Sequence, residues 1–314
     1  MDVANRLELL YYLNDNSHQI DALIRNRCEA EVLAIISEVS NVLGIESKII
    51  AEAVKEGGFR EFWKLIQGNS NAITVVLLVV QLLATTAPLV LESENEELEN
   101  ELNRLQIEET KLNIEKLRKE IKEAEPSTES ASKATTHLSK NLKIIKRKSN
   151  FYSALSGYPD VSQIGINILN NNLVPTGDEK KVTKKEFRKF ILSSNKLKAE
   201  ELEAEIDIVS PVLKEGKYKW KGIYNEQPIS FEMLDLAFKD MVLMDNIPFQ
   251  HGTSILAVLR ISRELDEVGD VKITGYAVTT VIEKRDDVST QETQQGKKYR
   301  HAKKYMESQG KLFT

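Results

Sequence analysis

The feature that most constrains this chain is the stretch Ala72–Leu91, in which fifteen of twenty side chains are apolar. It lies inside Gly68–Leu91, a run of 24 residues without a formal charge. A helix needs about 20 apolar residues to cross the ~30 Å hydrocarbon core of a bilayer. The stretch therefore predicts a membrane-spanning helix. The residues assigned to it are Ala72, Ile73, Leu77, Leu82 and Leu91.

Two other interpretations of this stretch stay open. Gln81 and Pro88 interrupt it, although membrane helices tolerate such residues better than charge. The same residues could form a helix buried in a protein core. The run Ile73–Val80 is rich in β-branched residues and could also form a pair of strands.

A long charged helix is predicted directly after it, over Glu92–Glu125. This segment holds twelve Glu and six Lys or Arg, with no Gly or Pro. Leucines repeat every seven residues on one face and isoleucines on another, so the pattern is not that of a regular coiled coil. The segment could join subunits, or it could be a solvated helix packed on its own protein. The predicted oligomer seam comprises Leu98, Leu105, Leu112, Ile114 and Ile121.

The charge is distributed unevenly along the chain. Residues 1–125 hold 23 acidic and 13 basic residues, whereas residues 126–314 hold 25 and 30, which together give the net charge of −5. The acidic front and mildly basic back suggest regions with different partners. Cys28 is the single cysteine, which excludes an intramolecular disulfide and fits a reducing compartment. Residues 1–20 lack the apolar core of a secretory signal.

Residues 1–67 are predicted to form a small helical domain. Apolar residues from Ile20 to Leu43 recur at steps of three and four, with Ser17 as the expected N-cap and Gly44 as the stop. Two shorter helices are expected over Ile49–Val54 and Phe59–Ile66. A short strand is possible at Leu9–Leu13.

The fold class predicted for the whole chain is α+β. Residues 68–91 form the apolar segment and 92–125 the charged helix. Residues 126–149 form a linker, Ser/Thr/Ala-rich over Pro126–Thr136 and then basic between Lys140 and Lys148. Residues 150–290 form a mixed α/β recognition domain, and 291–314 a basic polar tail.

The β module of this domain is expected over residues 206–283. In Lys217–Ile223 every second residue up to Lys221 is lysine, while Tyr218 and Trp220 point the other way, which is typical of a strand with one buried face. Short strands and one helix of Met233–Val242 suggest a small barrel or half-open sheet, of SH3-like or OB-like size.

No catalytic motif, metal ligand set or cofactor site is assigned. The glycines form neither G-x-x-x-x-G-K-[ST] nor G-x-G-x-x-G, and there is no G-x-S-x-G or H-E-x-x-H. His18 with Asp21 could act as an acid/base pair, but helix capping explains the aspartate. Asp160 with Asp178 and Lys180 resembles a metal-dependent nuclease pattern only loosely. These patterns favour a protein without enzymatic activity, and an enzyme whose site is dispersed in the fold stays open as a further alternative.

Two features could bind nucleic acid. Trp220, Phe231 and Phe249 could form a stacking platform for single strands or the core of the barrel. The tail holds the most basic patch of the chain, which could contact nucleic acid or anionic lipid. That patch comprises Lys297, Lys298, Arg300, Lys303 and Lys304.

The sequence as a whole favours a membrane-associated, oligomeric sensor, effector or scaffold, of the kind that a bacterial defence or stress response could use. Its partners would be membrane lipid or further copies, through Ala72–Leu91 and Glu92–Glu125, with the large domain on the cytoplasmic side. The alternative is a soluble nucleic-acid-binding protein whose apolar segment is buried in an oligomer core.

Overall fold

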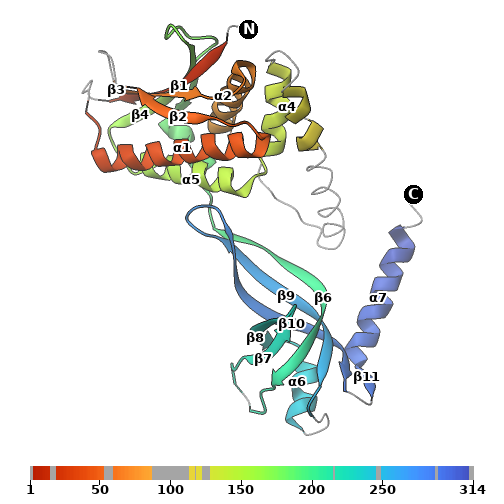
Figure 1. Cartoon of the computed structure of the whole chain (residues 1–314). Coiled ribbons are helices and arrows are strands. Elements are labelled where there is room, and N and C mark those ends of the chain that lie inside the picture. Colours follow the sequence, from red (N-terminus) through yellow and green to blue (C-terminus); the bar gives the residue numbers. More distant parts are fainter. Residues whose placement is uncertain are drawn as a thin grey trace. The chain divides into compact units, whose positions relative to one another are not determined.

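The chain folds into two units, which are described separately (Figure 1). The computed structural model describes residues 3–14, 19–52, 59–86, 113–116, 118–121, 128–214, 216–244, 249–286 and 289–310. Unit 1 comprises Met1–Ser194 with Glu267–Asp270, and unit 2 comprises Asn195–Asp266 with Val271–Thr314. The domain predicted over residues 150–290 therefore extends into both units.

Unit 1 is built on a five-stranded antiparallel sheet with the order β2-β3-β1-β4-β5. The strands are β1 (Ala4–Leu13), β2 (Lys48–Glu52), β3 (Phe59–Ile66), β4 (Val161–Asn170) and β5 (Lys180–Thr183). The helices are α1 (Ala22–Leu43), α2 (Ser70–Thr85), α4 (Thr128–Leu138) and α5 (Leu142–Ser156), followed after β5 by the 3₁₀ helix η1 (Lys184–Phe190). Leu7 lies opposite Trp63 on one side and Ile168 on the other, and all three are buried on the same face of the sheet.

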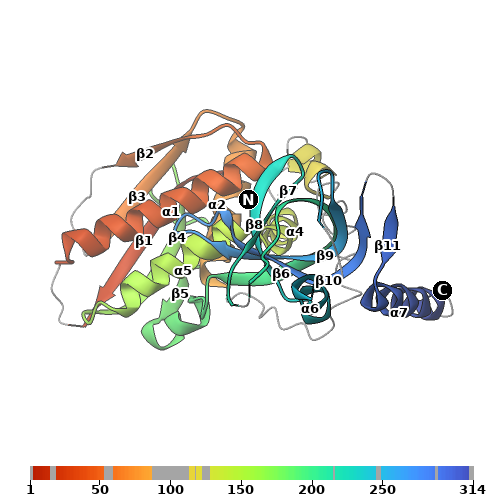
Figure 2. The same cartoon turned by 90° about the horizontal axis from the view of Figure 1, so that it is seen from below.

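The chain path of unit 1 contains a split β-α-β motif. Along the chain, β1 is followed by α1 and β2, and β2 is followed by β3, with which it pairs. Helices connect β3 to β4, and in the sheet β1 lies between β3 and β4. This is the β-α-β-β-α-β arrangement of ferredoxin-like sheets, extended by β5 and by extra helices. α1 and α5 lie side by side (Figures 1 and 2).

The apolar stretch forms the central helix of unit 1. α2 has 16 residues, and eleven of them are buried, because it packs against β1, β4, α1 and α4. Its polar residues reach the sheet: Thr74 Oγ1 donates to the carbonyl oxygen of Ala4, and Gln81 Nε2 donates to that of Ile166 at 2.8 Å. A helix that is apolar all round is buried in the core of a protein or in a membrane, and here the core surrounds it.

The predicted membrane-length helix is therefore wrong. Among the described residues, no helix combines the length and apolar character that crossing a bilayer requires. Ala72, Ile73 and Leu77 are buried in the core of unit 1, and Leu82 is partly buried against it. Leu91 lies outside the described residues.

The N-terminal region is only partly helical. α1 agrees with its prediction, and Gly44 ends it at φ 65°. Asp21 caps its start; the predicted N-cap, Ser17, lies outside the described residues. The two shorter helices predicted after it are the strands β2 and β3. The large apolar residues of β3 recur at steps of three and four, which is also the spacing of one face of a helix. In the structure Trp63 and Leu65 are buried on one side of the sheet.

The predicted linker is also helical. α4 buries Ala131, Ala134 and Leu138 on one face, against α2. Its Ser and Thr residues are exposed or partly exposed, so the composition alone resembles that of a linker. The basic run that follows begins before α5 with Lys140, and its other basic residues lie in α5, where Lys146 and Lys148 are buried.

Only part of the predicted charged helix is described, namely residues 113–116 and 118–121. Ile121 is 3% exposed and belongs to the core of unit 1, and Ile114 is half-buried. Arg118 Nε donates to the carbonyl oxygen of Val42 at 2.8 Å. Ile121 is therefore packed within the core of its own unit. Leu98, Leu105 and Leu112 lie outside the described residues.

Unit 2 is a closed five-stranded barrel, which confirms the predicted β-barrel module. The ring runs β6-β7-β8-β10-β9 and closes because β9 also pairs with β6. Its strands are β6 (Lys196–Ser210), β7 (Trp220–Tyr224), β8 (Gln227–Met233), β9 (Ser254–Leu265) and β10 (Val271–Arg285). The other elements are α6 (Leu236–Leu243), which packs into the barrel, β11 (Thr290–Glu292) and α7 (Gln294–Gly310).

Candidate nucleic-acid interface

Aromatic side chains fill the barrel. The ring centroid of Trp220 lies 6.2 Å from that of Phe231, 6.2 Å from that of Phe238 and 5.6 Å from that of Phe249. Trp220, Phe231 and Phe238 are fully buried. These residues form the core of the barrel rather than a stacking platform on its surface, which decides between the two interpretations of the sequence.

Burial of Trp220 fixes which side chains of β7 face outward. Trp220 and Gly222 point inward, so Lys221 and Ile223 are exposed. A Cβ atom on Gly222 would lie 2.7 Å from the carbonyl oxygen of Asp207, so this position requires glycine. β7 therefore lies close to β6 and presents a lysine on its outer face.

In the loop between β6 and β7, a hydrogen bond and a ring contact fix the position of Gly216. Gly216 has φ 136°, a conformation that other residues rarely adopt, and its carbonyl oxygen accepts a hydrogen bond from Lys239 Nζ at 3.1 Å. The ring of Tyr218 packs against Gly216, where an added Cβ would lie 2.7 Å from the Tyr218 ring. Tyr218 is nevertheless 57% exposed. The predicted alternation thus holds for Trp220 and fails for Tyr218, which precedes β7.

We call the exposed group around this loop the lysine–tyrosine surface. It comprises Lys214, Lys217, Tyr218, Lys219 and Lys221, all exposed. Lys219 Nζ lies 3.9 Å from Glu232, at the outer limit of an ion pair. The apolar side chains of Val209 and Leu213, which are 61% and 67% exposed, flank the surface. It combines positive charge with an accessible aromatic ring.

The basic patch predicted in the tail lies on α7, and two of its residues, Arg300 and Lys303, form ion pairs within unit 2. Arg300 binds Glu283 and, at 2.8 Å, Glu292, while Lys303 binds Glu203 at 2.7 Å. The hydrogen bonds that Arg300 and Arg285 donate to Glu283 hold the pKa of its carboxyl below the usual value, and that from Arg300 has the larger effect.

The remaining lysines of this patch are exposed on α7. They are Lys297, Lys298 and Lys304. The helix begins against the barrel, because Thr293 Oγ1 accepts from the backbone N–H of Gly296 and a Cβ on Gly296 would lie 2.2 Å from the carbonyl oxygen of Ile282. The patch is therefore split between internal ion pairs and three exposed charges.

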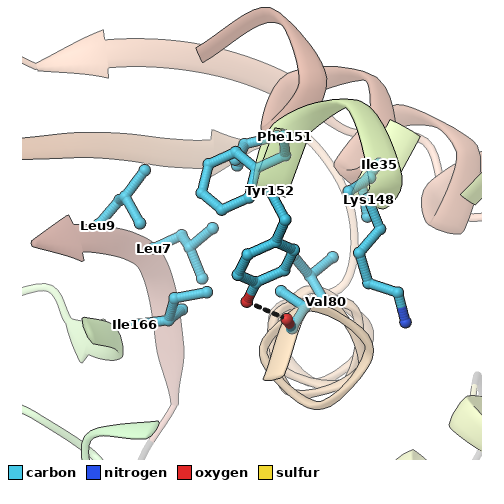
Figure 3. Close-up of a pocket in the computed structure, with 10 residues that line it drawn as sticks. Leu7, Leu9, Ile35, Val80, Lys148, Phe151, Tyr152 and Ile166 are labelled. Atoms are coloured by element: carbon cyan, nitrogen blue, oxygen red, sulfur yellow. Dashed lines mark hydrogen bonds between the residues drawn. The ribbon is translucent and has the colours of Figure 1, made fainter. Parts of the chain in front are cut away.

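A small cavity lies in the described part of unit 1, next to Lys148 and Tyr152 (Figure 3). Its volume of about 10 Å³ is close to the minimum for one water molecule. Tyr152 donates a hydrogen bond to the carbonyl oxygen of Ala84 at 2.6 Å. This space is too small for a substrate, so it is a packing defect rather than a binding pocket.

Within the described part of the chain, no three His, Cys, Asp or Glu side chains gather closely enough to bind a metal ion. His18 lies outside the described residues, and Asp21 caps α1. Burial raises the pKa of the Cys28 thiol to about 12, so this cysteine is a poor nucleophile.

Comparison with protein families, with curated proteins and with solved structures finds no match to this chain. The lysine–tyrosine surface and the connectivity of the barrel are therefore the features that bear on function.

Proposed function

We propose that the barrel of unit 2 binds single-stranded nucleic acid through the lysine–tyrosine surface. The observation that carries the proposal is the exposed ring of Tyr218, packed against Gly216, with four exposed lysines within four residues of it along the chain. Surfaces that bind single strands combine lysines along the phosphate backbone with aromatic rings on which bases stack.

The chain path of the barrel supports the same function. Numbered from β6, its strands follow one another around the ring as 1-2-3-5-4, the third and fifth are parallel, and α6 connects the third to the fourth. This is the Greek-key connectivity of the OB fold, which binds oligonucleotides and oligosaccharides with its second and third strands and the loop between the first and second. The lysine–tyrosine surface occupies that loop and the start of β7.

The composition of the surface favours a polyanion over a sugar. An uncharged oligosaccharide would gain little from four lysines, whereas each phosphate of a single strand can release counterions when a lysine binds it. A single strand is favoured over a duplex because Tyr218 can stack only on a base that is not already enclosed by its neighbours.

The test is a binding measurement by fluorescence anisotropy. A labelled single-stranded oligonucleotide of about 20 nucleotides exceeds the ~4–16-nucleotide site of one OB barrel. It is titrated with full-length protein at several salt concentrations, as RNA and as DNA. Duplexes of the same sequence and anionic phospholipid vesicles are the comparison ligands. We expect the single strands to bind most tightly, with an affinity that falls steeply as salt rises.

Variants separate charge from stacking. Replacing Lys214, Lys217 and Lys221 together by Ala should lower the slope of log Kd against log salt by about 2, since each contact contributes roughly 0.7. Tyr218→Ala should raise Kd by roughly 5- to 150-fold without a change of slope, and Tyr218→Phe should bind like the wild type. The matched triple variant of Lys297, Lys298 and Lys304 tests the tail patch. Loss of binding in that variant alone, or tighter binding to vesicles, would contradict the proposal.

A further inference from the structure

β2 is an edge strand of the sheet in unit 1. It pairs with β3 on one side, and among the described strands none pairs with its other side. Figures 1 and 2 both show it at the margin of the sheet. Ile50, at the middle of β2, is 37% exposed, and Ala51 is exposed. An edge strand with exposed apolar residues presents backbone N–H and C=O groups to which another strand can pair.

The sequence of β2 is complementary to itself. Its five residues read Lys-Ile-Ile-Ala-Glu. If two copies pair antiparallel about Ile50, Lys48 of each copy lies opposite Glu52 of the other, and Ile49 lies opposite Ala51. Opposite charges that face each other across strands stabilise the pair, as do apolar neighbours. Lys48, Ile50 and Glu52 share one face because side chains alternate along a strand.

Glu52 is already positioned for this contact. Arg6 Nε lies 2.6 Å from Glu52 Oε2, and the guanidinium also donates to Oε1 at 3.0 Å. This two-point contact fixes the carboxylate on the face that carries Lys48, and its side chain is still 30% exposed. A lysine from a second copy would join an ordered ion pair, so little side-chain entropy of Glu52 would be lost.

The opposite edge of the sheet has a different character. β5 has four residues, and it begins with Lys180 and Lys181. Two such strands paired antiparallel about their centre would place Lys180 opposite Thr183 and Lys181 opposite Val182, so no acidic residue would face a lysine. Lysines on an edge strand are a common means of preventing strand pairing. The sequence of β2 is therefore suited to pairing with a copy of itself, whereas the sequence of β5 is not.

We propose that β2 pairs antiparallel with β2 of a second copy, so that the sheets of two units 1 continue into each other. The contact is isologous, and each copy contributes the same five residues to it. A strand of five residues spans about 17 Å. Its contact area is smaller than the ~1,600 Å² of a typical stable complex, so the dimer dissociates in the micromolar range.

Sedimentation velocity on the full-length protein up to about 100 µM tests the dimer. We expect wild-type protein to dimerise as its concentration rises. In a dimer of Lys48→Glu, the new glutamate at position 48 of each copy faces Glu52 of the other copy. In a dimer of Glu52→Lys, Lys48 of each copy faces the new lysine at position 52 of the other. Each variant alone should dimerise at least ~10-fold more weakly. An equimolar mixture of the two should recover a heterodimer, because each glutamate then faces a lysine.

A charge change at the opposite edge and a second disrupting variant in β2 serve as controls. Lys180→Glu makes the same charge change at the other edge and should leave dimerisation unchanged. If Glu52→Lys fails to fold because it loses Arg6, Ile50→Arg replaces it as the disrupting variant and should also weaken the dimer. Wild-type protein that stays monomeric overturns the proposal. So does a dimer that Lys48→Glu and Ile50→Arg leave intact, or a mixture of folded variants that stays monomeric.

Discussion

The side chain of Lys148 in α5 lies with its Nζ 3.1 Å from the backbone carbonyl oxygen of Leu83 in α2. A second bond of 3.1 Å joins the same Nζ to the carbonyl oxygen of Thr86. The lysine is 3% exposed and thus replaces water at the carboxyl end of α2, where the helix dipole favours positive charge. The first prediction follows from its burial.

Burial lowers the pKa of Lys148 from 10.5 to about 8. Between these values the unfolded chain binds more protons than the folded one, so the free energy of unfolding should rise with pH, at up to ~1.4 kcal/mol per pH unit. Cys28 acts in the opposite direction above pH 9, because its pKa is raised from 9.0 to about 12 in the folded state. We therefore expect a gain of roughly 1 kcal/mol between pH 7.5 and 9 and little change above.

Urea unfolding at several pH values checks this prediction. A Trp220→Phe background leaves Trp63 as the fluorescent reporter, and Trp63 lies in unit 1. Lys148→Met should remove the gain, and Cys28→Ala should extend it towards pH 10. A profile that is the same with and without Lys148 would show that this amine does not titrate differently on folding.

The second prediction concerns α2. Leu77 is fully buried in the core of unit 1, so Leu77→Ala should lower the free energy of unfolding by about 2–5 kcal/mol. Leu23→Ala on α1 is the control, because Leu23 is 78% exposed and its loss should cost less than about 0.5 kcal/mol. Trp63 fluorescence in urea measures both. Equal effects of the two variants would contradict the position of α2 in the core.

This helix shows what its sequence could and could not reveal. Its apolar character was evident, but the same residues suit a bilayer and a protein core. The hydrogen bonds of Thr74 to β1 and of Gln81 to β4 distinguish the protein core from the bilayer. Those partners are about 70 and 85 residues away along the chain, and no local pattern indicates them.

Local signals were reliable where periodicity and a terminal residue agreed. α1 was predicted because its apolar spacing stops at Gly44, which does adopt a left-handed conformation. β3 was missed because aromatic residues at helical spacing can equally alternate between the faces of a sheet. In the barrel, alternation identified Trp220 as buried, but the exposed position of Tyr218 depends on the conformation of Gly216 and on Lys239.

The third prediction concerns Asp235 in the barrel. Its carboxylate accepts hydrogen bonds from the backbone N–H of Phe238, at the start of α6, and of Val281 in β10. It also accepts from the amide of Gln295 in α7. Asp235→Ala leaves these donors without their acceptor and should cost roughly 2–4 kcal/mol.

The matched control for this substitution is Asp240→Ala, which removes an exposed carboxylate from the same helix and should cost less than about 0.5 kcal/mol. A Trp63→Phe background leaves Trp220 to report unfolding of the barrel. An Asp235→Ala variant as stable as this control would show that other contacts hold α6 and α7 in place.

The last prediction links the backbone of the loop to binding. Gly216→Ala forces a Cβ into a conformation at φ 136° and within 2.7 Å of the Tyr218 ring. The ring should lose its fixed position, so the variant should bind single strands as weakly as Tyr218→Ala, roughly 5- to 150-fold below wild type. Gly275→Ala is the control, because a Cβ there meets nothing within 4 Å. Anisotropy titrations of the three variants measure the effect. If Gly216→Ala binds like the wild type while Tyr218→Ala does not, the ring contributes without needing the loop to hold it.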